Sequence, residues 1–379
     1  MSWSLVNLST VCQIDMGSAP KGSTYVELDS GVPLIAGAAD YGDVFPQPKK
    51  ATLEPTKLCK KGDIIICVRA TIGDLNWADK EYCLGRGVAG LRAHDEKLDS
   101  KYLWYFIASI EDELYRNSTG STFPQINKKV IESLKIPLPP LETQKQIAAV
   151  LEKADQLRKD CQQMEQELNS LAQSVFIDMF GDVRSNSFNS KKVKFDDIFE
   201  INSKLVDPRL PEFENLPHIG PEHLEKRTGR ILPYRTARED ALVSGKFNFQ
   251  KGCVLFSKIR PNLKKVAIPE FSGLCSADMY PLEAVDGVST REFIWGLILS
   301  DAFDDYLETL PSRANIPKIN RKELAAFEFY LPDLRDQKAY SKKLAKIQEQ
   351  LKQNACLYQE TENNFNALMQ KAFKGKLTL

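Results

Sequence analysis

The chain repeats one of its own segments after a fixed interval of 193 residues. Segment 124–145 reads PQINKKVIESLKIPLPPLETQK, and segment 317–338 reads PKINRKELAAFEFYLPDLRDQK. The two align without a gap and share nine of 22 residues, among them Gln144 and Gln337. The interval is as long as a whole domain, whereas the repeats of solenoid proteins recur after only about 20 to 50 residues. We therefore expect two related domains, which offer two similar surfaces to two copies of a partner.

The composition is typical of a folded protein from a reducing compartment. A chain of 379 residues with 42% apolar residues is long enough for roughly two to four folded units. Its eight cysteines show no C-x-x-C spacing, and with three histidines they predict no zinc site. No signal-peptide pattern and no apolar run of bilayer-spanning length is visible, so we expect a cytoplasmic protein without a membrane partner.

Strand and helix patterns divide the chain into four blocks. The first block, 1–136, is mixed, with strands expected at Ile64–Val68 and Val88–Arg92 and a helix at Lys101–Ile110. The third block, 187–329, follows the same plan but differs strongly outside the shared elements. A common scaffold with divergent loops is expected when two domains recognise different targets.

The second and fourth blocks, 137–186 and 330–379, are expected to be long helices. From Ile147 to Val175, apolar residues recur at alternating steps of three and four, and the fourth block has a more polar version of this pattern. The spacing predicts a coiled-coil seam. Four residues are predicted to lie in the core of the seam: Leu157, Leu168, Ile347 and Phe365. The predicted fold is α+β, with two mixed α/β domains separated by two long antiparallel coiled-coil helices and a pseudo-two-fold internal repeat.

No catalytic constellation is visible. Gly85–Gly90 matches G-x-G-x-x-G, but a strand is expected after it, whereas a dinucleotide site needs a helix there. The sequence has no G-x-x-x-x-G-K-[ST] loop for ATP, no Asn/Asp-Pro-Pro-aromatic methyltransferase motif and no triad around its histidines. We therefore expect no catalytic residue, no metal site and no cofactor in this chain.

Positive charge is segregated although the net charge is zero. Lys226–Arg238 contains five basic residues and Lys246–Lys265 contains six, and neither run contains an acid. Such runs neutralise DNA phosphates. Basic residues in or near these runs, together with those of the first block, are the candidate DNA contacts: Lys49, Lys50, Lys57, Arg69, Lys128, Arg227, Arg230, Arg235, Lys258, Arg260, Lys264 and Arg313.

The two halves together resemble the DNA-specificity (S) subunit of type I restriction–modification enzymes. The resemblance rests on STFPQINK at 121–128 and IPLPPLETQKQI at 136–147, and on their second copies IPKIN at 316–320 and LPDLRDQK at 331–338. It spans nearly the whole chain. The second copy departs from the pattern where Asp333 replaces the second proline of the first copy.

The resemblance implies a non-catalytic reader of double-stranded DNA. Two target-recognition domains, 1–136 and 187–329, would each recognise one half of a split, asymmetric site. Two conserved helical regions, 137–186 and 330–379, would set the gap between the halves. They would also recruit two methyltransferase (M) subunits and, in a restricting system, two restriction (R) subunits. Those partners would bind S-adenosylmethionine, ATP and Mg²⁺ and methylate adenine or cleave DNA.

Two other classes of function remain open. One is a coiled-coil scaffold whose mixed domains bind proteins, which salt-sensitive DNA binding would separate from a DNA reader. The other is an enzyme with nuclease or methyltransferase activity of its own. Incubation of the chain alone with DNA and labelled S-adenosylmethionine tests the methyltransferase version.

Overall fold

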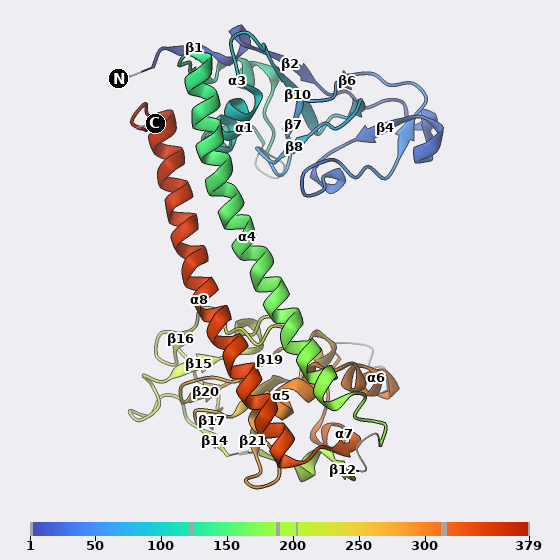
Figure 1. Ribbon diagram of the computed structural model, residues 1–379, viewed down its shortest axis with the longest axis vertical. Coiled ribbons are helices and arrows are strands. Elements are labelled where there is room, and N and C mark those ends of the chain that lie inside the picture. Colours follow the sequence, from blue (N-terminus) through green and yellow to red (C-terminus); the bar gives the residue numbers. More distant parts are fainter. Residues whose placement is uncertain (1–2, 121–123, 187–189, 202–203, 312–316, 378–379) are drawn as a thin grey trace. The chain divides into compact units, whose positions relative to one another are not determined.

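The computed structural model describes residues 3–120, 124–186, 190–201, 204–311 and 317–377. The chain divides into two compact units. Unit 1 comprises Met1–Cys161 and Leu357–Leu379, and unit 2 comprises Gln162–Cys356. Each of the two long helices therefore contributes residues to both units, and each unit adds a mixed α/β body (Figure 1).

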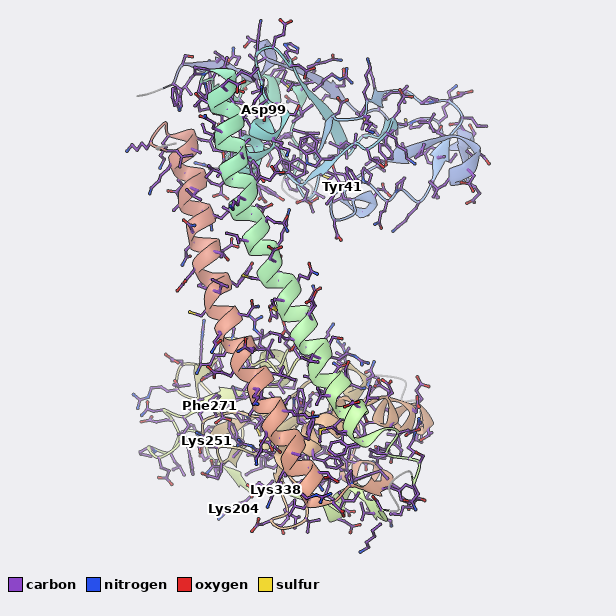
Figure 2. All side chains as sticks on the ribbon, viewed as in Figure 1. Tyr41, Asp99, Lys204, Lys251, Phe271 and Lys338 are labelled. Carbon is purple, nitrogen blue, oxygen red and sulfur yellow. The ribbon has the colours of Figure 1, made fainter. Side chains whose placement is uncertain are left out.

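Unit 1 contains a four-stranded antiparallel sheet in the order β2-β10-β7-β8. Its strands are β2 (Cys12–Met16), β10 (Val88–Ala93), β7 (Ile64–Cys67) and β8 (Leu75–Trp77). The continuous apolar run of β7 is typical of a strand covered on both faces, and all its residues are buried. Helix α1 (Ser100–Ser109) begins after Asp99 (Figure 2), whose carboxylate accepts the Tyr102 N–H and so caps the helix. The expected strands and helix of the first block are confirmed.

A second, five-stranded sheet of unit 1 has the order β3-β5-β4-β9-β6, and a two-stranded sheet pairs β1 with β11. The strands are β3 (Tyr25–Val26), β5 (Ala51–Thr52), β4 (Val32–Ile35), β9 (Tyr82–Leu84), β6 (Leu58–Cys59), β1 (Leu5–Asn7) and β11 (Lys135–Pro137). The remaining helices are α2 (Glu111–Arg116) and α3 (Lys128–Ser133). The glycines of Gly85–Gly90 join β9 to β10 and enter that strand, with no helix after them, so they do not form a dinucleotide loop.

Unit 2 has sheets in the orders β13-β21-β18-β19, β14-β17-β20-β15-β16 and β12-β22. The strands are β12 (Lys191–Lys194), β13 (Phe199–Ile201), β14 (Leu205–Val206), β15 (Pro217–Ile219), β16 (Arg235–Thr236), β17 (Lys246–Phe249), β18 (Val254–Ser257), β19 (Val266–Ala267), β20 (Gly273–Cys275), β21 (Met279–Ala284) and β22 (Glu328–Leu331). The short helices are α5 (Arg291–Leu299), α6 (Asp301–Thr309) and α7 (Arg321–Ala325).

The strand pairing of the two units corresponds in the strands that the two scaffolds share, although β3 and β14 lie at different edges of their sheets. In unit 1, β10 lies between β2 and β7, as β21 lies between β13 and β18 in unit 2. Strand β4 pairs parallel with β9 and antiparallel with β5, as β15 pairs parallel with β20 and antiparallel with β16. The β4–β5 loop (36–50) therefore corresponds to the β15–β16 loop (220–234). These loops have unrelated sequences, so one of the divergent segments falls at the same place on both scaffolds.

The two expected long helices are α4 (Leu141–Phe180) and α8 (Leu334–Phe373), each of 40 residues. Glycines with a left-handed backbone follow both: Gly181 has φ of 59° and Gly375 has φ of 66°. A residue in this conformation ends a helix because the chain turns away from its axis.

Burial on α4 follows only half of the predicted seam. Ile147, Ala154 and Cys161 are buried. The alternate seam positions are exposed: Val150 (38%), Leu157 (49%), Met164 (48%) and Leu171 (47%). The prediction that Leu157 is a core residue is therefore wrong, whereas Ile347 and Phe365 are buried and Leu168 is half-buried. In unit 1, the side of α4 that packs into the core carries residues at steps of three and four, namely Ile147, Ala148, Leu151 and Ala154. Leu157 is not part of this core, because it points away from that side of the helix.

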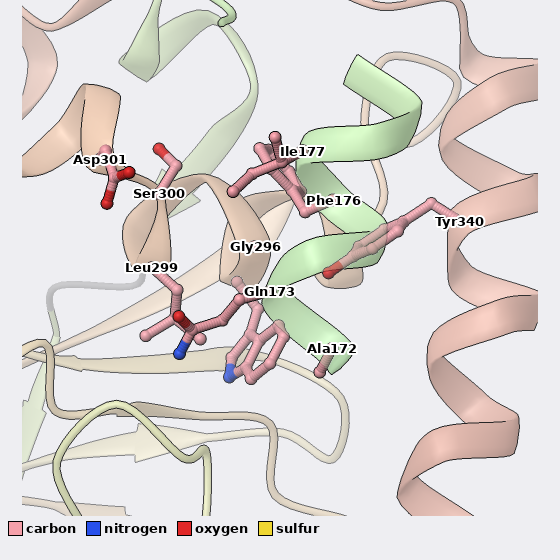
Figure 3. A pocket seen from close by; sticks show the side chains of 10 residues that line it. Ala172, Gln173, Phe176, Ile177, Gly296, Leu299, Ser300, Asp301 and Tyr340 are labelled. Atoms are coloured by element: carbon pink, nitrogen blue, oxygen red, sulfur yellow. The ribbon is translucent and has the colours of Figure 1, made fainter. Parts of the chain in front are cut away.

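In unit 2, a glycine allows α5 to approach both long helices. A Cβ atom on Gly296 would lie 2.4 Å from Cδ2 of Phe176 on α4 and 2.8 Å from the hydroxyl oxygen of Tyr340 on α8. Figure 3 shows these side chains beside Gly296. The cavity left at this junction has a volume of about 20 Å³. This is space for one water molecule, so the junction is a packing site rather than a ligand site.

Candidate nucleic-acid interface

The repeated Pro-x-Ile-Asn motif fixes the loop that follows the central strand of each unit. In unit 1, the Ala70 N–H donates to the Pro124 carbonyl at 3.1 Å, and the Ile126 N–H donates to the Val68 carbonyl at 3.0 Å. In unit 2, the Arg260 N–H donates to the Pro317 carbonyl at 2.7 Å, and the Ile319 N–H donates to the Lys258 carbonyl at 3.0 Å. The motif therefore positions two equivalent loops, one after β7 and one after β18.

These two loops hold non-glycine residues in the left-handed region. Ala70 has φ of 61°, and Arg260 occupies the equivalent place with φ of 49°. Such conformations are strained, and they are found often at binding and active sites because surrounding contacts enforce them. The same loop position thus presents a methyl group in unit 1 and a guanidinium group in unit 2.

The predicted contacts in unit 1 lie mostly on the surface. Lys49, Lys50, Lys57 and Arg69 are exposed, and within the described ranges no acidic side chain lies at ion-pair distance from them. Lys128 is exposed on α3 and pairs with Glu132 at 3.6 Å. Four cations of this unit are therefore available to phosphates, whereas Lys128 is partly neutralised.

Apart from Lys264, three predicted contacts in unit 2 have acidic partners. Arg227 lies 3.2 Å from Asp304, and Arg230 lies 3.0 Å from Glu165 on α4. Lys258 lies 3.6 Å from Asp278 and is half-buried. Ion pairs at the surface are weak, so a phosphate competes with these carboxylates at little cost.

Lys264 does not present its charge at the surface. Its side chain is fully buried, and its ammonium group donates to the carbonyls of Leu299 and Ser300 at 2.8 Å and pairs with Asp304 at 2.5 Å. Burial lowers the pKa of this lysine, although Asp304 opposes the effect. The ammonium joins the end of α5 to the start of α6. The structure therefore corrects the expectation for Lys264, which is placed to hold the fold rather than a phosphate.

Two of the predicted arginine contacts in unit 2 are exposed and have no acidic side chain at ion-pair distance in the described part of the chain. Arg235 lies on β16, at the edge of the five-stranded sheet, and Arg260 lies on the loop after β18. Arg313, the last predicted contact, lies outside the described residues. Arg235 and Arg260 are thus the strongest candidates of this unit.

Two neighbours of these loops were missed by sequence reasoning. Gln125 forms an isolated bridge with Arg69, and Lys318 forms one with Ile259. Both side chains are exposed, and glutamine and lysine donate to base edges. The signal was present in the sequence, because both residues occupy the variable position of the Pro-x-Ile-Asn repeat.

The described residues offer little else that is chemically reactive. Among them, no group of three or more His, Cys, Asp or Glu side chains is arranged to hold a metal ion. Burial raises the pKa of the Cys59 and Cys253 thiols to about 12, so these groups are protonated at neutral pH and are poor nucleophiles. No helix within the described ranges has the length and apolar character needed to cross a bilayer.

Comparison with known proteins gives a consistent result. The family model described as "Type I restriction modification DNA specificity domain" matches residues 2–170 and again residues 189–363. The chain is 29% identical over 323 residues to the type I restriction enzyme EcoDI specificity subunit of Escherichia coli, covering 74% of this chain and 71% of that protein. It is 22% identical over 404 residues to the MjaVIII specificity subunit of Methanocaldococcus jannaschii, covering 99% and 93% respectively.

A solved structure has a similar fold over nearly the whole chain. The crystal structure of the type I restriction–modification S subunit from M. genitalium aligns with a TM-score of 0.61 and 16% sequence identity, and covers 98% of this chain and 96% of that one. At this identity the likeness shows the fold alone.

Proposed function

We propose, because this chain belongs to the type I restriction–modification DNA specificity family, that it recognises the DNA target sequence of a type I restriction–modification complex. The observation that carries the proposal is the duplicated scaffold, in which equivalent loops carry different side chains at the same position, as at Ala70 and Arg260. Each unit also exposes cations without acidic partners, which neutralise phosphates and fix the position of a protein on DNA.

The target that we infer is bipartite and asymmetric. Unit 1 offers Lys49, Lys50, Lys57 and Arg69 to DNA, whereas unit 2 offers Arg235 and Arg260. Two readers with different loop chemistry recognise different bases, so the two half-sites differ in sequence. Base-edge readout would fall to the loops that carry Gln125 in unit 1 and Arg260 and Lys318 in unit 2.

We propose that the long helices recruit two methyltransferase subunits and, in a restricting system, two restriction subunits. The exposed apolar positions of α4 support this proposal, because Val150, Leu157, Met164 and Leu171 recur at strict seven-residue intervals. A partner helix packs against such a stripe as in a coiled coil. Substitution of Leu157 and Met164 by serine is expected to weaken co-purification of the methyltransferase subunit and to leave the fold intact.

The helices are also proposed to set the gap between the half-sites, as an antiparallel pair. Insertion of four residues into α4 at an exposed position would add about 6 Å to a helix that rises about 1.5 Å per residue. The expected result is a changed gap or a failure of assembly. A methylation pattern identical to that of the wild type would remove the spacer role.

The chain itself is proposed to be non-catalytic. S-adenosylmethionine, ATP and Mg²⁺ would be bound by the partner subunits. Adenine methylation by the isolated chain would contradict this assignment.

The alternative is a scaffold whose mixed domains bind proteins. DNA binding measured at several salt concentrations separates the two functions, because phosphate contacts give an affinity that falls steeply with salt. Specific binding of one split sequence by the chain with its methyltransferase partner supports the DNA reader. Absence of DNA binding at low salt supports the scaffold.

A further inference from the structure

The β4–β5 loop of unit 1 presents two adjacent apolar side chains at its tip. Val44 is 46% exposed and Phe45 is 49% exposed, although the next residue, Pro46, is buried. Tyr41, which is labelled in Figure 2, lies in this loop three residues before Val44. Single exposed apolar residues are common on proteins, but a consecutive pair at a loop tip needs a physical reason.

Hydrogen bonds hold this tip in one shape. The Gly42 N–H donates to the Phe45 carbonyl at 3.1 Å, and the Trp77 N–H of β8 donates to the Val44 carbonyl at 2.9 Å. The buried Asn76 side chain donates to the Gly42 carbonyl at 2.9 Å. A Cβ atom on Gly42 would lie 2.5 Å from the Phe45 carbonyl oxygen, so only glycine fits this turn. The exposed pair is therefore held in place by the sheet and loses little entropy on binding.

The charges near the tip favour nucleic acid as its partner. Lys49 and Lys50 follow the tip, are exposed, and have no acidic side chain at ion-pair distance in the described chain. The acids of the loop precede the tip: Asp40 accepts the Ala36 N–H at 2.8 Å, and Asp43 is exposed. Val44 also lines a cavity that contains Glu152 and Asp155, but these acids are paired with Lys101 at 2.7 Å and with Lys159 at 2.8 Å. Two free cations on the same loop as an apolar pair provide one contact for phosphates and another for an apolar part of a base.

We propose that Val44 and Phe45 read the 5-methyl group of thymine in the half-site that unit 1 recognises. The proposal rests on the function proposed above and adds the chemistry of one contact. The thymine methyl is the apolar group that the major groove displays, and side chains such as phenylalanine contact it. The corresponding loop of unit 2 carries Arg227 and Arg230 instead, so this contact belongs to one half-site only.

The test uses the full chain assembled with a methyltransferase partner. Duplexes are selected from a randomised pool with the wild type and with the double variant Val44→Ser/Phe45→Ser. The matched control is Leu53→Ser, an apolar residue of unit 1 that is 63% exposed outside the tip. Equal thermal melts of all three proteins show that the serine side chains leave the fold intact.

The variant is expected to lose selection for thymine at one or two positions of one half-site and to keep the other half-site and the gap. Replacing that thymine by uracil is expected to weaken wild-type binding about fourfold, the value of one buried methyl group. The same replacement should leave binding by the variant unchanged, and the control should behave as the wild type does.

Three results would overturn the proposal. An unchanged motif in the variant, or a uracil effect that persists in it, means that the tip does not read a methyl group. A variant that keeps its motif and loses the methyltransferase partner means that the tip is a protein contact. Failure of the wild type to select any motif is a different result, because it removes the proposed function itself.

Discussion

Gln144 and Gln337, which lie 193 positions apart, make the same three hydrogen bonds in the two units. Gln144 accepts the Asp99 N–H and donates to the carbonyls of Lys97 and Pro139. Gln337 accepts the Thr290 N–H and donates to the carbonyls of Val288 and Pro332. Both side chains are fully buried, and each ties the first turn of a long helix to the residue that caps α1 or α5.

Gln144→Ala is expected to destabilise unit 1 by about 1 to 3 kcal/mol, because it leaves the buried Pro139 carbonyl, the half-buried Asp99 N–H and the Lys97 carbonyl without this partner. Denaturant unfolding measures the loss, and hydrogen exchange of the Asp99 amide should accelerate. The exposed neighbour Gln146→Ala is the control and should change stability by less than about 0.5 kcal/mol. Equal effects of the two substitutions would contradict the anchoring role.

Arg260→Ala is expected to weaken DNA binding and to lower the salt slope by about 0.9, the value of one phosphate contact. The reason is that Arg260 is exposed without an acidic partner on a loop fixed by Pro317. Binding is measured by fluorescence anisotropy over a range of salt concentrations. The control is Arg335→Ala on α8, where the arginine side chain is 88% exposed, and this substitution should leave the salt slope unchanged. A wild-type slope for Arg260→Ala would remove this residue from the interface.

Lys264→Ala is expected to cost about 3 to 5 kcal/mol of stability, because it removes the buried ammonium partner of Asp304 and of two carbonyls. Thermal or denaturant unfolding tests this expectation. Lys251→Ala, which removes an exposed ion pair with Glu270, should cost no more than about 1 kcal/mol. If Lys264→Ala unfolds as the wild type does and only loses DNA affinity, then Lys264 contacts phosphate after all.

Native alkylation at pH 8 is expected to spare Cys59 and Cys253 and to modify Cys356, which is exposed. Burial raises the pKa of the two buried thiols to about 12, so the reactive thiolate forms only as the pH approaches that value or as the chain unfolds. Mass spectrometry after iodoacetamide treatment identifies the cysteines that have been alkylated. Rapid modification of Cys253 in the native protein would contradict its burial.

The sequence predicted the elements that local patterns determine. The strands expected at Ile64–Val68 and Val88–Arg92 and both long helices were predictable, because apolar runs and heptads have a definite period. The exposure of Leu157 was not predictable, since a heptad pattern does not say which of its two apolar positions a neighbour covers.

The candidate interface was predicted less well than the fold. The acid-free run around Lys264 indicated a basic surface, but the acid that neutralises this lysine is Asp304, 40 residues later in the chain. Contacts between residues so far apart depend on the fold. The turn that exposes Val44 and Phe45 likewise depends on hydrogen bonds from Asn76 and Trp77 of β8.

The most direct test of DNA recognition by this chain is a genome-wide, single-base map of N6-methyladenine. The map is made in a host that carries the partner subunits, with and without the gene for this chain. The predicted result is that one split, asymmetric motif is methylated only when the chain is present, which gives both half-sites and the gap at once. An identical methylation map in the two strains would contradict the account.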